Sequence, residues 1–139
     1  MLTLTDDFLK DFFIKSENIV IVGASNKKER ASNGIARFLL KKGYECFLVN
    51  PKENMVLGKK TYKTLADIPV RPDIVDVFRK SEAAPSIVEE AIKKEAKLIW
   101  LQEEVYSEKA KMLAEKAHIP IVMNKCLYKE FMRLGLYAI

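Results

Sequence analysis

A glycine, a hydroxyl group and several cations follow one short apolar run near the start of the chain. The apolar residues 19–22 end at Gly23, Ser25 comes two positions later, and a polar loop then carries Lys27 and Arg30. An amphipathic segment follows, so the pattern is that of a buried strand, a tight turn and a helix. A helix N-terminus offers unpaired N–H groups and the positive end of its dipole to an anion. These residues therefore predict a phosphate site for a nucleotide-like ligand.

Three further residues complete the predicted phosphate site, namely Ala24 after the strand and Asn33 and Gly34 at the start of the helix. Gly23 would let the backbone approach the ligand closely, and Ser25 would donate its hydroxyl to a phosphate oxygen. The glycine spacing is neither G-x-G-x-x-G nor G-x-x-x-x-G-K-[ST], so neither motif identifies the ligand. The alternative is that Gly23 only turns the chain.

Polar and basic residues also follow the second apolar run, where Asn50, Pro51 and Lys52 stand. An NAD-specific dehydrogenase places an acid at this point to accept hydrogen bonds from the ribose, whereas this chain has no acid before Glu53. Lys52 therefore argues against NAD and for an additional phosphate on the ribose. The alternative is a surface turn opened by proline.

An aromatic side chain and two cations, Phe78, Arg79 and Lys80, follow the third apolar run. Phe78 can form a wall for an adenine ring, and Arg79 can pair with phosphate. The alternative is a core phenylalanine beside two solvated cations.

The last two apolar runs supply further candidate contacts. Trp100 and Gln102 stand at the end of the fourth run, and Asn124 and Cys126 follow the fifth. Cys126 precedes an expected helix, whose N-terminus stabilises a thiolate. The alternatives are that Trp100 packs in the core and that Cys126 is an inert buried thiol.

The residues needed for acid–base or nucleophilic catalysis are not assembled at these positions. His118 is the only histidine, and it precedes the fifth run, at the end of a parallel sheet where active sites do not usually lie. No spacing of histidine, cysteine and acidic residues indicates a metal site. Asp73 is expected to begin the third strand and Asp76 to serve a helix end.

Short apolar runs alternate with amphipathic segments along the whole chain, which is typical of an α/β fold. The pattern predicts a single domain over residues 1–139, with a Rossmann-like, five-stranded parallel sheet, helices on both faces, and an N-terminal helix within residues 1–17 packed on it. Ligands bind such sheets at the carboxyl ends of the strands. A loop is expected at 50–60 and a helical turn at 64–68. The expected helices are 5–15, 32–42, 82–94, 107–117 and 125–134, and the expected strands are 18–22, 44–49, 73–78, 97–101 and 119–123.

The composition fits a soluble cytoplasmic protein. Of the 139 residues, 49% are hydrophobic and 31% are charged, and no apolar run approaches the roughly 20 residues that span a membrane. The N-terminus shows no signal-peptide pattern, and the two cysteines make no disulfide framework. The net charge of +5 suits an anionic ligand, but no stripe of aromatic and basic residues suggests nucleic acid. Abundant lysine and glutamate with a single glutamine favour a thermophilic source.

The segments at the expected strand ends read IVGAS at 21–25, FLVNP at 47–51, DIVDVFRKSE at 73–82, KLIWLQ at 97–102 and IVMNKC at 121–126. In this order they resemble the CoA-binding domain family. That family includes small stand-alone proteins and the N-terminal domain of the α subunit of succinyl-CoA synthetase and of ADP-forming acyl-CoA synthetases. The resemblance spans about residues 18–134 and is fairly specific to the stand-alone branch.

This resemblance implies coenzyme A as the ligand. It also implies an orientation for the bound molecule. The diphosphate would lie over 23–25 and the start of the helix, near Arg30 and Asn33, the adenosine against 50–52 and 78–80, and the pantetheine arm toward 100–102 and 124–126.

We therefore expect a non-catalytic protein that binds CoA or an acyl-CoA. The synthetases need a phosphorylated histidine on a second domain and a nucleotide-grasp subunit; this sequence contains neither, so we expect no synthetase turnover from it alone. Two alternatives stay open: an NADP-type oxidoreductase or sensor domain, and a subunit of a split ADP-forming acyl-CoA synthetase. The acyl group and the assembly, whether a homo-oligomer or a complex with a partner subunit, stay open as well.

Overall fold

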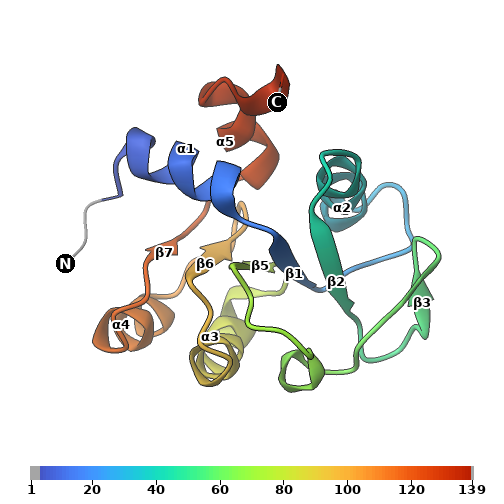
Figure 1. Ribbon diagram of the computed structural model, residues 1–139. Coiled ribbons are helices and arrows are strands. Elements are labelled where there is room, and N and C mark those ends of the chain that lie inside the picture. Colours follow the sequence, from blue (N-terminus) through green and yellow to red (C-terminus); the bar gives the residue numbers. More distant parts are fainter. Residues whose placement is uncertain (1–3, 139) are drawn as a thin grey trace.

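A five-stranded parallel sheet forms the centre of the molecule (Figure 1). The computed structural model describes residues 4–138. The predicted α/β class and parallel sheet are confirmed. Across the sheet the strands lie in the order β2 (Glu45–Val49), β1 (Asn18–Val22), β5 (Ile74–Val77), β6 (Leu98–Leu101) and β7 (Ile121–Val122).

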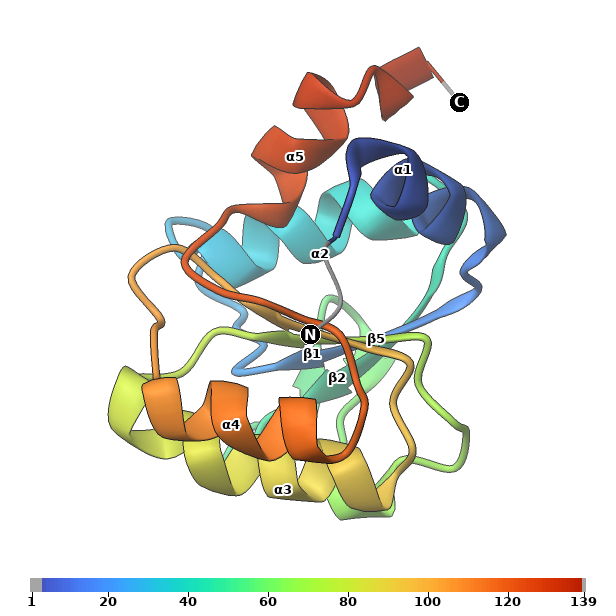
Figure 2. The ribbon, with the colours of Figure 1, turned by 90° about the vertical axis from the view of Figure 1, so that its left-hand side faces the viewer.

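Helices cover both faces of the sheet, as Figures 1 and 2 show. Residues of β5 alternate between the two sides, so that Ile74 packs into one hydrophobic cluster and Val75 into the other. Because both faces are covered, all of β5 is buried and reads as a nearly continuous apolar run. One layer consists of α1 (Asp6–Lys15), α2 (Ala31–Lys41) and α5 (Leu127–Arg133), and the other of α3 (Ala84–Lys93) and α4 (Glu108–Lys116).

Local signals in the sequence set the helix starts. The side chains of Thr5 and Ser107 accept hydrogen bonds from backbone N–H groups in the first turns of α1 and α4, so both residues act as N-caps. The helix α1 is held to the sheet by Phe13, which is fully buried. Its ring lies 5.7 Å from that of Trp100 and 4.4 Å from that of Phe131, measured between ring centroids.

The segment 50–60 contains a small hairpin and is not a plain loop, which corrects the expectation. In it, β3 (Met55–Val56) pairs antiparallel with β4 (Lys59–Lys60). The two residues between them, Leu57 and Gly58, have φ values of 54° and 74°. A two-residue turn with both φ values positive has the twist that a hairpin requires. The 3₁₀ turn Leu65–Asp67 lies inside the expected 64–68.

The connection that crosses the sheet fixes where a ligand can bind. The chain passes from β1 to its neighbour β2 and then returns across β1 to β5, so the winding direction reverses between β1 and β5. Loops that leave the carboxyl ends of two such strands diverge and open a crevice. The topology therefore places a candidate site after Val22 and Val77.

The helices are short. The longest in residues 4–138 is α2, with 11 residues. No helix within this described part is both long and apolar enough to cross a bilayer.

Candidate functional site

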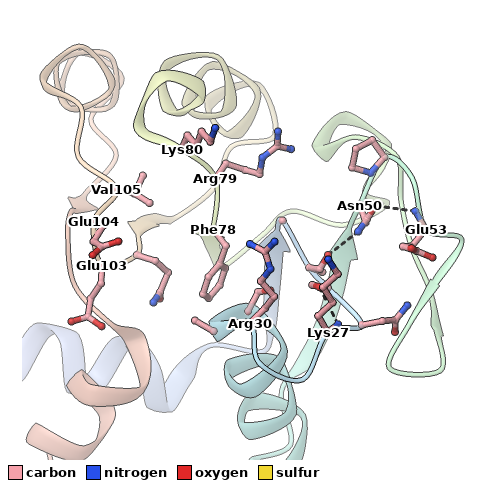
Figure 3. A pocket seen from close by; sticks show the side chains of 18 of the residues that line it. Lys27, Arg30, Asn50, Glu53, Phe78, Arg79, Lys80, Glu103, Glu104 and Val105 are labelled. Atoms are coloured by element: carbon pink, nitrogen blue, oxygen red, sulfur yellow. Dashed lines mark hydrogen bonds between the residues drawn. The ribbon is translucent and has the colours of Figure 1, made fainter.

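A cleft of about 800 Å³ opens at the carboxyl ends of the strands, over the β1–β5 crevice. Figure 3 shows its lining, with Phe78 at the centre, Lys27 and Arg30 on one side, and Glu103 and Glu104 on the other. The structure brings together twelve of the residues that the sequence singled out: Gly23, Ala24, Ser25, Arg30, Asn50, Pro51, Lys52, Phe78, Arg79, Lys80, Gln102 and Cys126.

Gly23 lets the loop after β1 pass close to the end of β5. Its φ is +92°, and a Cβ built on it would lie 2.6 Å from the carbonyl oxygen of Phe78. The N–H groups of Gly23 and Ala24 both donate to the carbonyl of Val49, at 3.1 and 3.2 Å. The loop is thus held between the ends of β2 and β5, and only a glycine fits at its first position.

The N-terminus of α2 faces the cleft without a cap. Arg30 is the N-cap residue, its side chain makes no capping hydrogen bond, and the first turn contains no acid. Ala31 and Ser32, the first two helical residues, line the cleft. Ser32 is only 4% exposed, and its hydroxyl has no hydrogen-bond partner within residues 4–138. A helix start without a side-chain cap can bind an anion, which accepts hydrogen bonds from the free N–H groups and from the hydroxyl.

Two asparagines brace the loops of the cleft. The side-chain amide of Asn50 donates to the carbonyl of Ala24 at 2.8 Å, and its oxygen accepts from the N–H of Lys52 at 2.7 Å. The amide of Asn33 donates to the carbonyl of Ser25 at 2.8 Å. The Asn50–Ala24 bond joins the loops after β1 and β2, and the Asn33–Ser25 bond ties the loop after β1 to α2.

The cations of the cleft are free of acidic partners. None of them has a carboxylate within ion-pair distance among residues 4–138. Outside the cleft, by contrast, Lys97 pairs with Asp73 at 3.1 Å. Unpaired cations around one hollow create a positive potential that attracts a polyanion. The cleft cations are Lys27, Arg30, Lys52, Arg79 and Lys80.

Four of the predicted site residues, Asn33, Gly34, Trp100 and Asn124, do not line the cleft. Trp100 is fully buried, and its indole N–H donates to the carbonyl of Lys125 at 2.8 Å. It packs under α1 because alternate residues of β6 face opposite sides of the sheet. Asn33 and Asn124 support the loops through hydrogen bonds, and Gly34 lies within α2.

Several lining residues were missed by the sequence reasoning. Ser32 stands at the predicted helix start, so the strand–turn–helix pattern was sufficient to find it. The cleft is also lined by Glu103, Glu104 and Val105, which follow β6 one to three residues beyond Gln102, so the rule that ligands bind at strand ends applies to them as well. The other lining residues outside the predicted set are Asn26, Ala31 and Glu53, and Lys27 of the predicted polar loop also lines the cleft.

Asp76 does not serve a helix end, so that expectation is wrong. It lies within β5, fully buried, and neither carboxylate oxygen has a hydrogen-bond partner in the described part of the chain. Burial raises the pKa of this carboxyl well above its usual value. Asp76 is not part of the cleft lining.

The two cysteines differ in their surroundings. Cys126 is half-buried and lines the cleft, whereas Cys46 is buried in β2, where burial raises the pKa of its thiol to about 12. No group of three or more His, Cys, Asp or Glu side chains that could hold a metal ion occurs in residues 4–138.

Comparisons with known proteins agree with this geometry. The family model described as "CoA binding domain" matches residues 17–132. A Bacillus subtilis (strain 168) relative, the uncharacterized protein YneT, is 34% identical over 120 residues, which are 86% of this chain and 88% of that protein. A hypothetical protein from Pyrococcus horikoshii OT3 has a similar structure, with a TM-score of 0.91, 40% identity, and coverage of 95% of this chain and 93% of the other.

A larger protein contains the same fold. The dinucleotide-forming acetyl-coenzyme A synthetase 1 of Ca. Korarchaeum cryptofilum matches with a TM-score of 0.72 and 20% identity. The match covers 85% of this chain but only 27% of the synthetase. At this identity the likeness concerns the fold alone.

Proposed function

The chain belongs to the CoA binding domain family, and from that premise we propose that it is a non-catalytic protein that binds coenzyme A or an acyl-CoA in the strand-end cleft. One observation carries the proposal. Five cations without acidic partners and the uncapped start of α2 converge on a single hollow at the β1–β5 crevice. CoA carries a diphosphate and a ribose phosphate, so it matches a site with this much positive charge.

The geometry supports a particular placement of the ligand. The diphosphate would accept hydrogen bonds at the α2 N-terminus, from Ser32 and from the loop that begins at Gly23. The ribose phosphate would lie within reach of Lys52 or Arg79, and Phe78 would pack against the adenine. The thiol end would then extend toward Gln102 and the β6 side of the cleft.

The lining of the cleft supports binding rather than turnover. Among the described residues that form it there is no histidine, and His118 lies in a separate hollow beside Arg71 and Lys97. Arg71 and Lys97 precede β5 and β6, so that hollow is at the opposite edge of the sheet. His118 therefore lies too far away to act as a general base on a ligand in the cleft.

The first prediction tests the identity of the ligand. CoA at about 100 times its Kd should stabilise the fold by about 2.7 kcal/mol. For a chain of this size the melting temperature should rise on the order of 10 °C. NAD should give a much smaller shift, because Lys52 stands where an NAD site has an acid. Differential scanning fluorimetry with CoA, NAD and NADP at matched concentrations measures the three shifts; equal shifts from NAD and CoA would contradict the proposal, and a dominant NADP shift would favour the nicotinamide alternative.

The second prediction tests the phosphate contacts. Arg79→Ala and Lys52→Ala should each lower CoA affinity tenfold or more, because a charge-assisted hydrogen bond contributes about 1.5–3 kcal/mol. If one of the two residues holds the 3′-phosphate, its variant should lose more affinity for CoA than for dephospho-CoA. Isothermal titration calorimetry with both ligands measures this. Arg71→Ala, at the opposite edge of the sheet, is the matched control and should bind CoA normally; unchanged affinity in the two cleft variants would remove Arg79 and Lys52 from the site.

A further inference from the structure

The cleft has opposite charges at its two ends. Figure 3 shows Arg30 on one side of Phe78 and Glu103 and Glu104 on the other. All five cleft cations follow β1, β2 or β5 and outnumber Glu53, which follows β2, whereas Glu103 and Glu104 follow β6. A polyanionic head group is drawn to the first end, so the uncharged arm of the same molecule is left at the β6 end.

The two glutamates at the β6 end are not equivalent. Glu103 is paired with Lys129, whose Nζ lies 3.0 Å from a carboxylate oxygen. The carboxylate of Glu104 has no cationic partner within residues 4–138. The net negative charge that faces this end of the cleft therefore comes from Glu104.

The backbone of Glu104 is held in place. Its N–H donates to Oδ1 of Asn124 at 2.7 Å, and its carbonyl accepts from the hydroxyl of Ser81 at 3.3 Å. Its φ of 71° lies in the left-handed region, which these two bonds stabilise. The charge is thus fixed to the β6 rim although the side chain is exposed.

Gln102 supplies an independent sign that a ligand group binds at this end. The side chain lines the cleft and is only 4% exposed. Its oxygen accepts from the N–H of Leu127 at 3.2 Å, while its amide nitrogen has no hydrogen-bond partner in the described part of the chain. This nitrogen is accessible from the cleft, so the amide is free to donate to an oxygen of the ligand. Beside it, Val105 adds apolar surface that is 7% exposed.

From these contacts we infer that the β6 end of the cleft takes an uncharged acyl group, with Gln102 donating to its thioester carbonyl, and rejects acyl groups that carry a second carboxylate. This inference rests on the proposed function and adds the substrate class. An acyl group with a terminal carboxylate would place that charge near the carboxylate of Glu104, which would repel it. The site therefore selects short neutral acyl-CoAs over dicarboxylic ones.

Calorimetric titration with CoA, acetyl-CoA and succinyl-CoA tests the inference. Acetyl-CoA should bind within about threefold of CoA, and succinyl-CoA about tenfold more weakly than acetyl-CoA, at low ionic strength. The difference should shrink as salt is added, because repulsion between solvent-exposed charges is screened. Equal affinities for acetyl-CoA and succinyl-CoA would overturn the inference while leaving CoA binding intact. Failure of all three ligands to bind would instead overturn the proposed function, and this inference with it.

Two single substitutions separate the local charge from the net charge of the protein. Glu104→Gln should raise the affinity for succinyl-CoA severalfold more than that for acetyl-CoA, because the removed carboxylate would repel the terminal carboxylate of the succinyl group. Glu89→Gln, on the exposed surface of α3 and away from the cleft, removes the same charge and should change neither affinity. A discrimination that survives Glu104→Gln, or that Glu89→Gln abolishes equally, would contradict the assignment to Glu104.

Discussion

Replacing Gly23 by alanine should lower the free energy of unfolding by about 2–5 kcal/mol and weaken CoA binding at the same time. The new Cβ would meet the carbonyl oxygen of Phe78 at 2.6 Å, and the φ of +92° disfavours any side chain. Relief of that contact requires the loop after β1 to move away from the end of β5. The same movement displaces Ser25 and the start of α2 from the phosphates. Urea denaturation and calorimetric titration measure the two effects.

Gly43→Ala is the matched control, because it imposes the same backbone strain without the clash. Gly43 has a φ of +98°, and an added Cβ would meet nothing within 4 Å. It follows the C-terminal end of α2, whereas Gly23 precedes the N-terminal end. We expect a loss of about 1–2 kcal/mol and an unchanged CoA affinity. If Gly23→Ala costs no more stability than Gly43→Ala, the close approach to Phe78 does not limit the fold.

The position of the cleft was predictable because parallel strands gather distant residues at one edge. Gly23, Asn50 and Phe78 are far apart in the sequence, yet each directly follows an apolar run. The apolar runs alternate with amphipathic segments, which predicts a parallel sheet, and a parallel sheet brings all these positions to its carboxyl edge. The rule that ligands bind at the carboxyl ends of parallel strands was therefore enough to predict most of the residues that line the cleft.

The predictions that were wrong or incomplete depend on the direction of a side chain and on its contacts in the fold, and neither can be read from a single sequence. Trp100 is the next-to-last residue of β6, and the alternation of the strand turns its side chain into the core, where the carbonyl of Lys125 accepts a hydrogen bond from the indole N–H. The hairpin after Asn50 was not predicted because its turn, Leu57-Gly58, lacks the usual Asn-Gly or Asp-Gly signal. Whether the Glu104 carboxylate has an ion-pair partner depends on where the lysines lie in the folded protein, and residue spacing in the sequence does not predict those positions.

Asp76 is the clearest case of a residue whose surroundings the sequence concealed. In register it lies between Ile21 of β1 and Trp100 of β6, on the buried face covered by α1, α2 and α5. Its carboxyl has no hydrogen-bond partner in the described residues, and burial alone raises its pKa. The native protein therefore holds a proton on Asp76 that the unfolded chain releases at mildly acidic pH.

Asp76→Asn should consequently stabilise the protein, and increasingly so as the pH rises. The substitution keeps the shape of the side chain and removes the need to bind a proton. Well below the unfolded pKa of about 3.9 the two proteins should be about equally stable, because the carboxyl is then protonated in both states of the wild type. Above that, wild-type stability should fall relative to the variant by about 1.4 kcal/mol per pH unit until the pH reaches the native pKa. Urea denaturation of both proteins between pH 4 and 8 measures the difference.

Asp73→Asn provides the opposite sign from a residue only three positions away. Burial raises the pKa of Asp73, but the N–H groups of Asn18 and Glu17 and the ammonium of Lys97 outweigh burial and hold that pKa below its usual value. Its carboxylate therefore stabilises the native state above the unfolded pKa, and this contribution disappears as the pH falls through the native one. The Asn variant should be less stable than the wild type at pH 7, with a gap that closes in acid. Should Asp76→Asn behave in the same way as Asp73→Asn, the carboxyl of Asp76 would have to be ionised and partnered in the native protein, contrary to the burial and geometry described above.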